Sequence, residues 1–172
     1  VEADEFDRSF LTLSPDIAIV TSVDADHLDI YGSADEMLKS FQEFTQKITD
    51  DGTLIYRLGL PFSNTKKKHF TYSLSEESDY YTTNLSIESG QYKFNLHSPS
   101  GMMKDLKFGM PGLHNVENAV AAFAAVHQLG LSEDEIRNGF ASFKGVKRRF
   151  EVLINSDELV YIDDYAHHPA EI

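Results

Sequence analysis

The sequence predicts an α/β fold, with a mostly parallel sheet and helices plus a smaller antiparallel β-meander. Short, β-branched apolar runs alternate with segments of helical periodicity, as they do in parallel-sheet domains. From about Lys67 to Phe108 the pattern changes to short runs of alternating polarity, separated by turns that contain Ser and Gly. The length of 172 residues fits one ordinary domain, or one domain and the start of a second.

The first half of the chain contains two expected strands around one expected helix. Residues 16–23 (DIAIVTSV) form a nearly continuous apolar run, typical of a buried strand of a parallel sheet. Residues 24–29 follow it, at the strand end where ligands collect in open α/β sheets. Residues 33–36 (SADE) have the pattern of a capping box and predict a helix to about Ile48. Residues 53–56 are the next expected strand.

After the meander, two further helices and two strands are expected. A helical pattern follows residues 111–112 (PG) and closes near Gly130. A second capping box, at residues 132–135 (SEDE), starts a helix that runs to about Phe143. Apolar runs at residues 150–154 and 159–162 then suggest a hairpin or a crossing between domains.

Composition excludes several classes of protein. The formal charge is −13, from 28 acidic and 15 basic residues, which opposes a general binder of nucleic acid or anionic membranes. With no Cys, a disulfide framework, a thiolate zinc site and a Cys nucleophile are excluded. No stretch approaches the roughly 18 apolar residues that would cross a bilayer. Because the sequence starts without Met and ends just after a His pair, we expect a piece of a longer polypeptide.

Acidic residues gather in two segments that could share a metal ion. Carboxylates with one imidazole suit Mg²⁺ or Mn²⁺. The alternative is that these loop carboxylates are simply solvated. The residues concerned are Glu2, Asp4, Glu5 and Asp7, and His27 with its neighbours Asp24, Asp26 and Asp29.

Asn115 and Asn118 lie three positions apart at the expected start of a helix, so their amides could read the edge of a purine. Alternatively, Asn115 only caps the helix. Residues 144–149 (KGVKRR) carry four cations that could hold a polyphosphate, or could favour the end of the preceding helix. No G-x-x-x-x-G-K-[ST] loop occurs, so the main cradle for a nucleoside triphosphate would lie elsewhere.

Taken in order, five motifs resemble those of the Mur ligases of bacterial peptidoglycan synthesis, which share their central ATPase domain with folylpolyglutamate synthetase. Residues 2–5 with 7–10 (EADE, DRSF) and 26–32 (DHLDIYG) are most similar to the type that joins L-alanine to UDP-N-acetylmuramate. The resemblance covers essentially the whole chain. The five motifs are residues 2–5 (EADE), 25–29 (ADHLD), 112–118 (GLHNVEN), 148–151 (RRFE) and 163–169 (DDYAHHP).

The resemblance implies three domains, which bind a UDP-sugar, ATP and an amino acid in that order. Residues 1–153 would be the later part of the central ATP-binding domain, and residues 154–172 the linker and start of the C-terminal domain. The missing domains, UDP-N-acetylmuramate and L-alanine are the implied partners, in the bacterial cytoplasm. ATP would activate the sugar carboxylate as an acyl phosphate, which the amine then attacks. Without the phosphate loop we expect this fragment to be inactive.

The resemblance also implies roles for single residues. Glu2 and His27 match residues that hold Mg²⁺, and Arg149 matches the Arg that meets the ATP phosphates, so these three are the implied catalytic residues. Asn115 and Asn118 match the pair on the adenine side of the nucleotide.

Asp164 matches an acid that reaches the nucleotide ribose. His114, Tyr165 and His167 lie in the same motifs, with no role assigned. Several relatives carry a carbamylated Lys where this sequence has Phe41 and Gln42, so a second metal on a carbamate is not expected.

Two other hypotheses stay open. The parent could be a recycling ligase that joins a tripeptide to the same UDP-sugar. Alternatively, the chain could be a non-catalytic acidic α/β module that binds partners.

Overall fold

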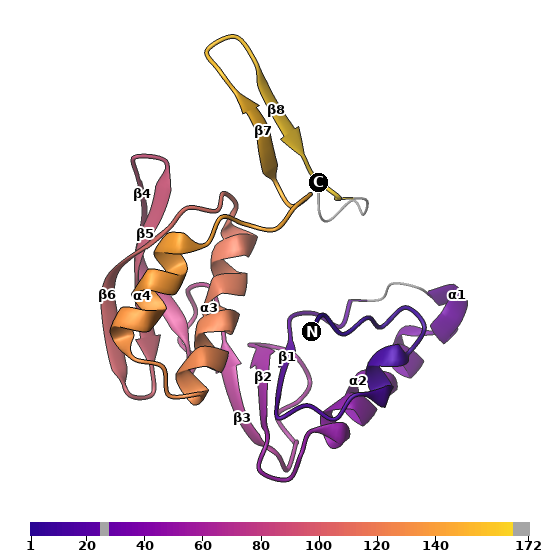
Figure 1. Cartoon of the computed structure of the whole chain (residues 1–172). Helices are drawn as coiled ribbons and strands as arrows, with labels where there is room; N and C mark the ends of the chain where they lie inside the picture. The colour runs from indigo at the N-terminus through magenta and orange to yellow at the C-terminus, as the bar shows by residue number, and fades with distance from the viewer. Residues whose placement is uncertain (25–27, 167–172) are drawn as a thin grey trace.

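The computed structural model describes residues 1–24 and 28–166, and its strands form three separate sheets (Figure 1). The parallel sheet has the order β1-β2-β3, the antiparallel meander the order β4-β5-β6, and β7 and β8 form a hairpin. In chain order, the elements are η1 (Ser9–Thr12), β1 (Ile17–Val20), α1 (Leu28–Tyr31), α2 (Ala34–Lys47), β2 (Thr53–Arg57), β3 (Lys68–Tyr72), β4 (Tyr81–Glu88), β5 (Gln91–Ser98), β6 (Gly101–Phe108), α3 (Leu113–Gln128), α4 (Glu133–Ser142), β7 (Glu151–Asn155) and β8 (Val160–Asp163).

β2 is the central strand of the parallel sheet and is buried on both faces. Leu54 and Tyr56 pack into a cluster that includes Phe44 and Ile48 from α2 and the loop that follows it. Ile55 points to the other face, where it joins the core around α3. This two-sided burial explains why the strand is apolar without alternation.

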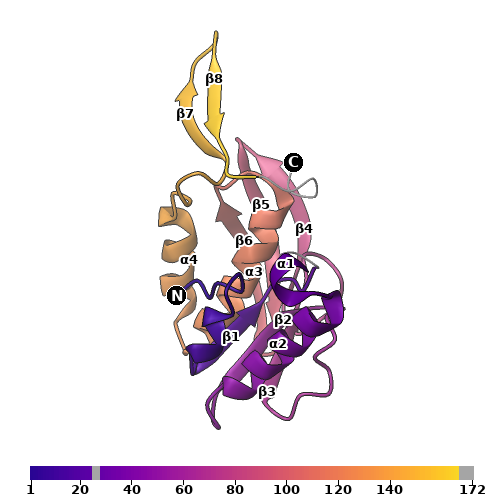
Figure 2. The same ribbon diagram turned by 90° about the vertical axis from the view of Figure 1, so that its right-hand side faces the viewer.

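α3 lies between the parallel sheet and the meander and contacts strands of both (Figures 1 and 2). Its buried residues Val116, Val120 and Phe123 form one core with Leu96 and Leu106 of the meander. α4 covers β6 at the outer edge of the meander. The helix that carries Asn115 and Asn118 is therefore fixed from two sides.

A series of hydrogen bonds joins the end of α3 to β3, β4 and the β5–β6 turn. Lys68 Nζ donates to Gln128 Oε1 at 2.8 Å, and Gln128 Nε2 donates to the hydroxyl of the fully buried Tyr80 at 2.7 Å. The two ring nitrogens of His127 lie 2.9 Å from the Tyr80 hydroxyl and 2.7 Å from Ser100 Oγ.

The β7–β8 hairpin stands away from the rest of the molecule in both views (Figures 1 and 2). Its apolar side chains are exposed, among them Leu153, Ile154 and Val160. Within the described part of the chain, no helix has both the length and the apolar character needed to cross a membrane.

The α/β class, the order of the elements and the hairpin are confirmed, but one assignment was wrong. Residues 68–72, expected to be part of the antiparallel meander, form β3, which pairs in parallel with β2. Alternating polarity identifies a half-buried strand but not its neighbour, so the sequence could not distinguish the two sheets.

The two expected capping boxes have different outcomes. At α4 both halves form, between Ser132 and Glu135. At α2 Ser33 accepts from the backbone N–H of Glu36, but the Glu36 carboxylate binds Lys39 at 2.6 Å. A nearby Lys therefore competes for the side chain that would have closed the second half of that box.

Candidate active site

Four of the expected site residues lie in two places, one around the N-terminal segment and the linker after α4, the other at the start of α3. Glu2 and Arg149 meet across the first of these, with Glu2 Oε1 3.7 Å from Arg149 Nη2. Both side chains are mostly exposed, so this contact alone contributes little to stability. Each charge can therefore exchange its partner for a ligand of opposite sign.

The nearby carboxylates of the N-terminal segment have a different role. Asp4 Oδ1 accepts the backbone N–H of Phe6 at 2.9 Å, and Asp7 Oδ1 accepts that of Ser9 at 2.8 Å. The hydrogen bonds to Ser9 lower the pKa of Asp7. These two carboxylates hold turns of their own backbone, so of the three Glu2 is the one directed at Arg149.

Arg149 lies between two residues with left-handed backbone, Arg148 (φ 60°) and Phe150 (φ 51°). Such a conformation is unfavourable for large side chains. Two carboxylates bind the backbone N–H groups involved: Glu151 Oε2 accepts from Arg148 at 3.0 Å, and Asp164 Oδ2 accepts from Phe150 at 2.8 Å. The bend in the linker that directs Arg149 toward Glu2 is therefore held by Glu151 and Asp164, one from each of the last two motifs.

Asp164 is also tied to the chain that follows it, because its Oδ1 accepts the N–H of Ala166 at 2.7 Å. The backbone N–H of Tyr165 donates to the carbonyl of Arg148 at 2.7 Å, and the Arg148 guanidinium lies 4.7 Å from the centre of the Tyr165 ring. The role expected for Asp164 at a ribose stays a prediction, since both its oxygens here hold backbone.

Asn115 and Asn118 lie in the first two turns of α3, as expected, but their environments differ. Asn118 is exposed, whereas Asn115 is buried and its amide donates to the carbonyl of Pro111 at 2.6 Å. The N-cap of α3 is Gly112, so the alternative in which Asn115 caps the helix is wrong. Gly112 has φ 89°, a backbone conformation that favours glycine, and a Cβ there would lie 2.5 Å from the ring of His114.

The remaining expected residues are described only in part. His27 and His167 lie outside the described residues, while the strand that leads to His27 ends at Val20, followed by Ser22 and Asp24 bound to each other. On α2, the ring of Phe41 packs on that of Phe10, with the two ring centroids 5.4 Å apart.

A magnesium ion fits the chemistry of this site without a dedicated cage. In residues 1–24 and 28–166 no three His, Asp or Glu side chains come together as a metal site. Mg²⁺ in nucleotide sites commonly uses one or two carboxylates, with phosphates and water as the other ligands. An exposed carboxylate such as Glu2 matches that requirement.

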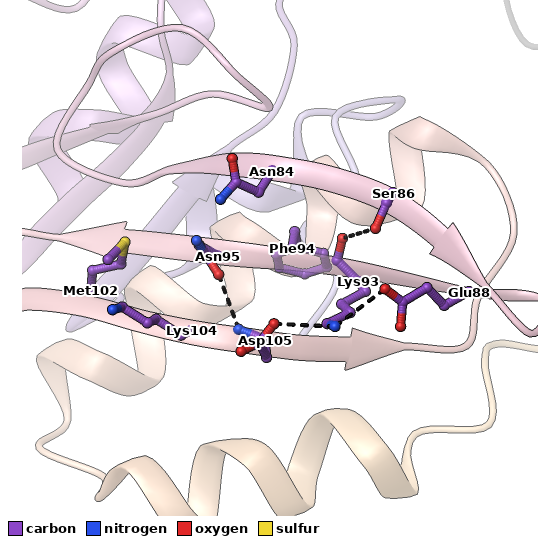
Figure 3. A pocket seen from close by; sticks show the side chains of 9 residues that line it. All are labelled: Asn84, Ser86, Glu88, Lys93, Phe94, Asn95, Met102, Lys104 and Asp105. Carbon is purple, nitrogen blue, oxygen red and sulfur yellow. Dashed lines mark hydrogen bonds and ion pairs between the residues drawn. The ribbon is translucent and has the colours of Figure 1, made fainter.

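Two hollows in the described surface differ in their relation to these residues. The larger one lies on the outer face of the meander, where Lys93 Nζ pairs with Glu88 at 3.2 Å and Asp105 at 3.3 Å, and Asn95 accepts the N–H of Asp105 (Figure 3). Its central charges are already satisfied.

The smaller hollow lies beyond the ends of β2 and β3, between Arg57 and Glu117 of α3. Arg57 was not among the expected site residues, and Glu117 lies within the motif at residues 112–118 but had no role assigned. The position of Arg57 at the end of a strand is the signal that could have found it.

An α/β domain of this kind, with polar residues at strand ends and at the start of a helix, has clear relatives. Residues 2–126 match the model of the Mur ligase middle domain. The chain belongs to the Mur ligase family.

Among curated proteins, the chain is 51% identical over 172 residues to the UDP-N-acetylmuramate–L-alanine ligase of Christiangramia forsetii and 46% identical over 176 residues to that of Porphyromonas gingivalis. All of the chain is matched in both cases, but it spans only 37% and 39% of those relatives. Among solved structures, MurC of Thermotoga maritima has a TM-score of 0.83 and 27% identity, covering 98% of this chain and 39% of that one. MurF of Acinetobacter baumannii has a TM-score of 0.80 and 25% identity, covering 96% and 37%.

Proposed function

We propose that this chain is the later part of the ATP-binding central domain of a ligase that joins L-alanine to the carboxylate of UDP-N-acetylmuramate, in peptidoglycan precursor synthesis. The observation that carries the proposal is the 51% identity, along the entire chain, to a relative with that name. Residues 1–153 would belong to the central domain, and the linker and start of the C-terminal domain would follow. An ATP-consuming reaction fits a cytoplasmic location.

The proposed reaction has two steps, phosphoryl transfer and amide formation. A carboxylate oxygen of UDP-N-acetylmuramate forms a bond to the γ-phosphorus of ATP, and ADP leaves. The amine of L-alanine then attacks the acyl phosphate, loses a proton and releases inorganic phosphate as the amide forms. Both steps gather negative charge on phosphate oxygens, so catalysis depends on positioning and on cations.

The described residues would supply part of this positioning and of this positive charge. Arg149, aimed by the bend of the linker, would bind phosphate oxygens through its guanidinium fork. Glu2 and His27 would hold Mg²⁺, which neutralises phosphate charge when bound. Asn115 and Asn118 would face the adenine, and Asp164 the ribose.

The test uses the full-length protein and measures phosphate release with ATP, UDP-N-acetylmuramate and either L-alanine or a tripeptide. We expect release that depends on L-alanine, and a loss of at least about ten-fold in kcat/KM for Arg149→Ala, the size of one lost charged hydrogen bond. Arg137→Ala is the matched control, because Arg137 binds Glu133 and the Lys104 carbonyl on α4 and β6.

Three results would contradict the proposal. Release only with the tripeptide would indicate the recycling ligase, and no ATP turnover with either acceptor would favour a binding module. Alanine-dependent release by the 172-residue chain alone would show that the phosphate loop is dispensable.

A further inference from the structure

Glu2 directly precedes a compact turn unit, residues 4–10, whose backbone closes on itself. The backbone N–H of Phe10 donates to the carbonyl of Asp4 at 3.3 Å, which joins the two ends of the unit. The Glu2 side chain is 90% exposed, so its own packing does not place its carboxylate. The position of that carboxylate therefore depends on how the turn unit sits on the rest of the molecule.

One anchor of the turn unit is Phe10, in η1. It is buried, and the centre of its ring lies 5.4 Å from that of Phe41 and 5.2 Å from that of Phe44, both on α2. Ala3, next to Glu2, adds the contact of one methyl group with the same core. A packed side chain at one end fixes the place of the unit, while its orientation needs a contact further along it.

Tyr31, the last residue of α1, supplies such a contact. Its hydroxyl donates to the carbonyl of Glu5 at 2.5 Å. The backbone N–H of Arg8 donates to the same carbonyl at 3.0 Å. A carbonyl oxygen has two lone pairs, so both acceptor positions of Glu5 are used and the plane of its peptide is fixed. This second anchor lies three positions after Glu2.

The ring of Tyr31 is itself held in place. It is 3% exposed, and the Arg8 guanidinium lies 4.8 Å from the ring centre. Arg8 has a left-handed backbone (φ 61°), which is unfavourable for a side chain of its size. α1 in turn contacts α2, the helix on which Phe10 packs (Figure 1). Both anchors of the turn unit therefore rest on the same pair of helices.

We propose that Tyr31 is a positioning residue for metal binding: its hydrogen bond to the Glu5 carbonyl orients the turn unit so that Glu2 presents its carboxylate to Mg²⁺. The inference rests on the proposed function, in which Glu2 binds that ion. Mg²⁺ demands near-octahedral geometry with ligands at about 2.0–2.1 Å, so a carboxylate whose backbone can turn binds it less well. Groups that orient a metal ligand from behind commonly tune the affinity for the metal.

The experiment measures binding of Mn²⁺ to the full-length protein with ADP, by electron paramagnetic resonance. Mn²⁺ suits the same oxygen ligands as Mg²⁺, and its unbound form is detected directly. Tyr31→Phe removes the hydroxyl but keeps the ring, and should raise the Kd for Mn²⁺ about five-fold, the effect of one neutral hydrogen bond. The Kd for ADP without metal should not change, because Tyr31 acts on the ion through Glu2.

A double-mutant cycle separates positioning from a general loosening of the structure. In a Glu2→Gln background, Tyr31→Phe should have no further effect on the Kd for Mn²⁺, because the ligand that Tyr31 orients is already gone. In the protein without metal or nucleotide, Tyr31→Phe should speed hydrogen exchange of the Arg8 amide about five-fold, since that amide shares the Glu5 carbonyl. Tyr81→Phe, in β4 of the meander, is the matched control and should change none of these values.

An unchanged Kd for Mn²⁺ in Tyr31→Phe would overturn the inference, and so would a loss of equal size with and without the Glu2 carboxylate. Either result leaves the proposed function intact as long as the wild type shows phosphate release that depends on L-alanine. If that release is absent while Mn²⁺ binding responds as expected, the proposed function fails and the role of Tyr31 stands. A wild type that binds no Mn²⁺ with ADP would overturn the inference together with the metal site on which it rests.

Discussion

β2 and β7 are both five-residue strands rich in apolar side chains, yet they lie in opposite environments. In β2, Leu54 and Ile55 have no exposed surface, whereas in β7 Leu153 and Ile154 are 51% and 45% exposed. β2 has a helix on each face, whereas β7 pairs with β8 and keeps its apolar side chains exposed. The comparison teaches that an apolar, β-branched sequence is enough to form a strand, while its burial depends on what lies across its faces.

The two regions are also held by different forces. The body around β2 is held by apolar burial, which stabilises by about 25 cal/mol for each Å² removed from water. The hairpin is held at its base by charged groups on backbone N–H, through Glu151 and Asp164. Cavities should therefore lower the stability of the region around β2, whereas the β7–β8 hairpin should be weakened by the loss of hydrogen bonds at its base.

The largest expected effect is a cavity in the body. Leu54→Ala should lower the free energy of unfolding of the 172-residue chain by about 2–5 kcal/mol, since the site is enclosed. Leu153→Ala is the matched change in the hairpin and should stay within about 0.5 kcal/mol. Urea denaturation measures both. Equal losses of stability would mean that Leu153 is buried in solution, and would contradict the contrast between β2 and β7.

A smaller effect is expected at the base of the hairpin. Asp164→Ala removes the acceptor of two backbone N–H groups, so the amides of Phe150 and Ala166 should exchange with solvent about ten-fold faster, as for one lost charged hydrogen bond. The amides of β2 should not change. Hydrogen exchange followed by NMR resolves these positions, and unchanged rates at Phe150 would show that the bend holds without the carboxylate.

The cap of α4 should contribute about 1 kcal/mol to the body. Ser132→Ala removes the hydroxyl that accepts from Glu135 N, and such losses cost about 0.5–2 kcal/mol. Ser33→Ala on α2 should cost less, because only half of that box forms. Thermal denaturation of both variants compares them, and a larger loss at Ser33 would contradict the structure.

The same cap should respond to pH. Hydrogen bonds from Ser132 lower the pKa of Glu135, so its folded value lies below the unfolded one. The contribution of the cap is then complete above the ordinary glutamate range and is lost as the pH falls through the lowered folded value. Glu135→Gln should remove that part of the pH dependence. A wild type and variant with parallel stability curves below pH 5 would refute this.

The smallest effect is expected at Glu2. Because the Glu2–Arg149 contact is long and exposed, Glu2→Gln should leave the melting temperature unchanged at any salt concentration. A salt-dependent decrease would assign Glu2 a structural role in joining linker to body.

Much of the fold could be predicted from local sequence patterns, but the pairing of its strands could not. Ser132 and Glu135 predict the start of α4, because a capping box depends only on two residues three positions apart in the sequence. The place of residues 68–72 in the parallel sheet depends on β2, which precedes them by a loop, so no local signal distinguished it.

The candidate site divides in the same way. Glu2, Asn115 and Arg149 were found through motifs, but their contacts were not. The meeting of Glu2 and Arg149 joins opposite ends of the chain. Glu117 was missed because a Glu on a helix is ordinary until Arg57 is seen opposite it.

The hydrogen bonds around Tyr80 have a direction. An ammonium can only donate, so Lys68 fixes the oxygen of Gln128 toward itself and the amide nitrogen toward Tyr80. Burial raises the pKa of Tyr80. Because the Gln128 amide donates to the Tyr80 hydroxyl, the hydroxyl directs its own proton at Nδ1 of His127. An imidazole that accepts this proton at Nδ1 carries its own proton on Nε2, from which it donates to Ser100 Oγ.

The tautomer of His127 is therefore set by a lysine that it does not touch. Replacing Gln128 with Glu would put an acceptor beside Tyr80, reverse the hydroxyl and move the imidazole proton to Nδ1. At the end of α3, the donor at Lys68 therefore fixes the direction of every hydrogen bond from Gln128 to Ser100.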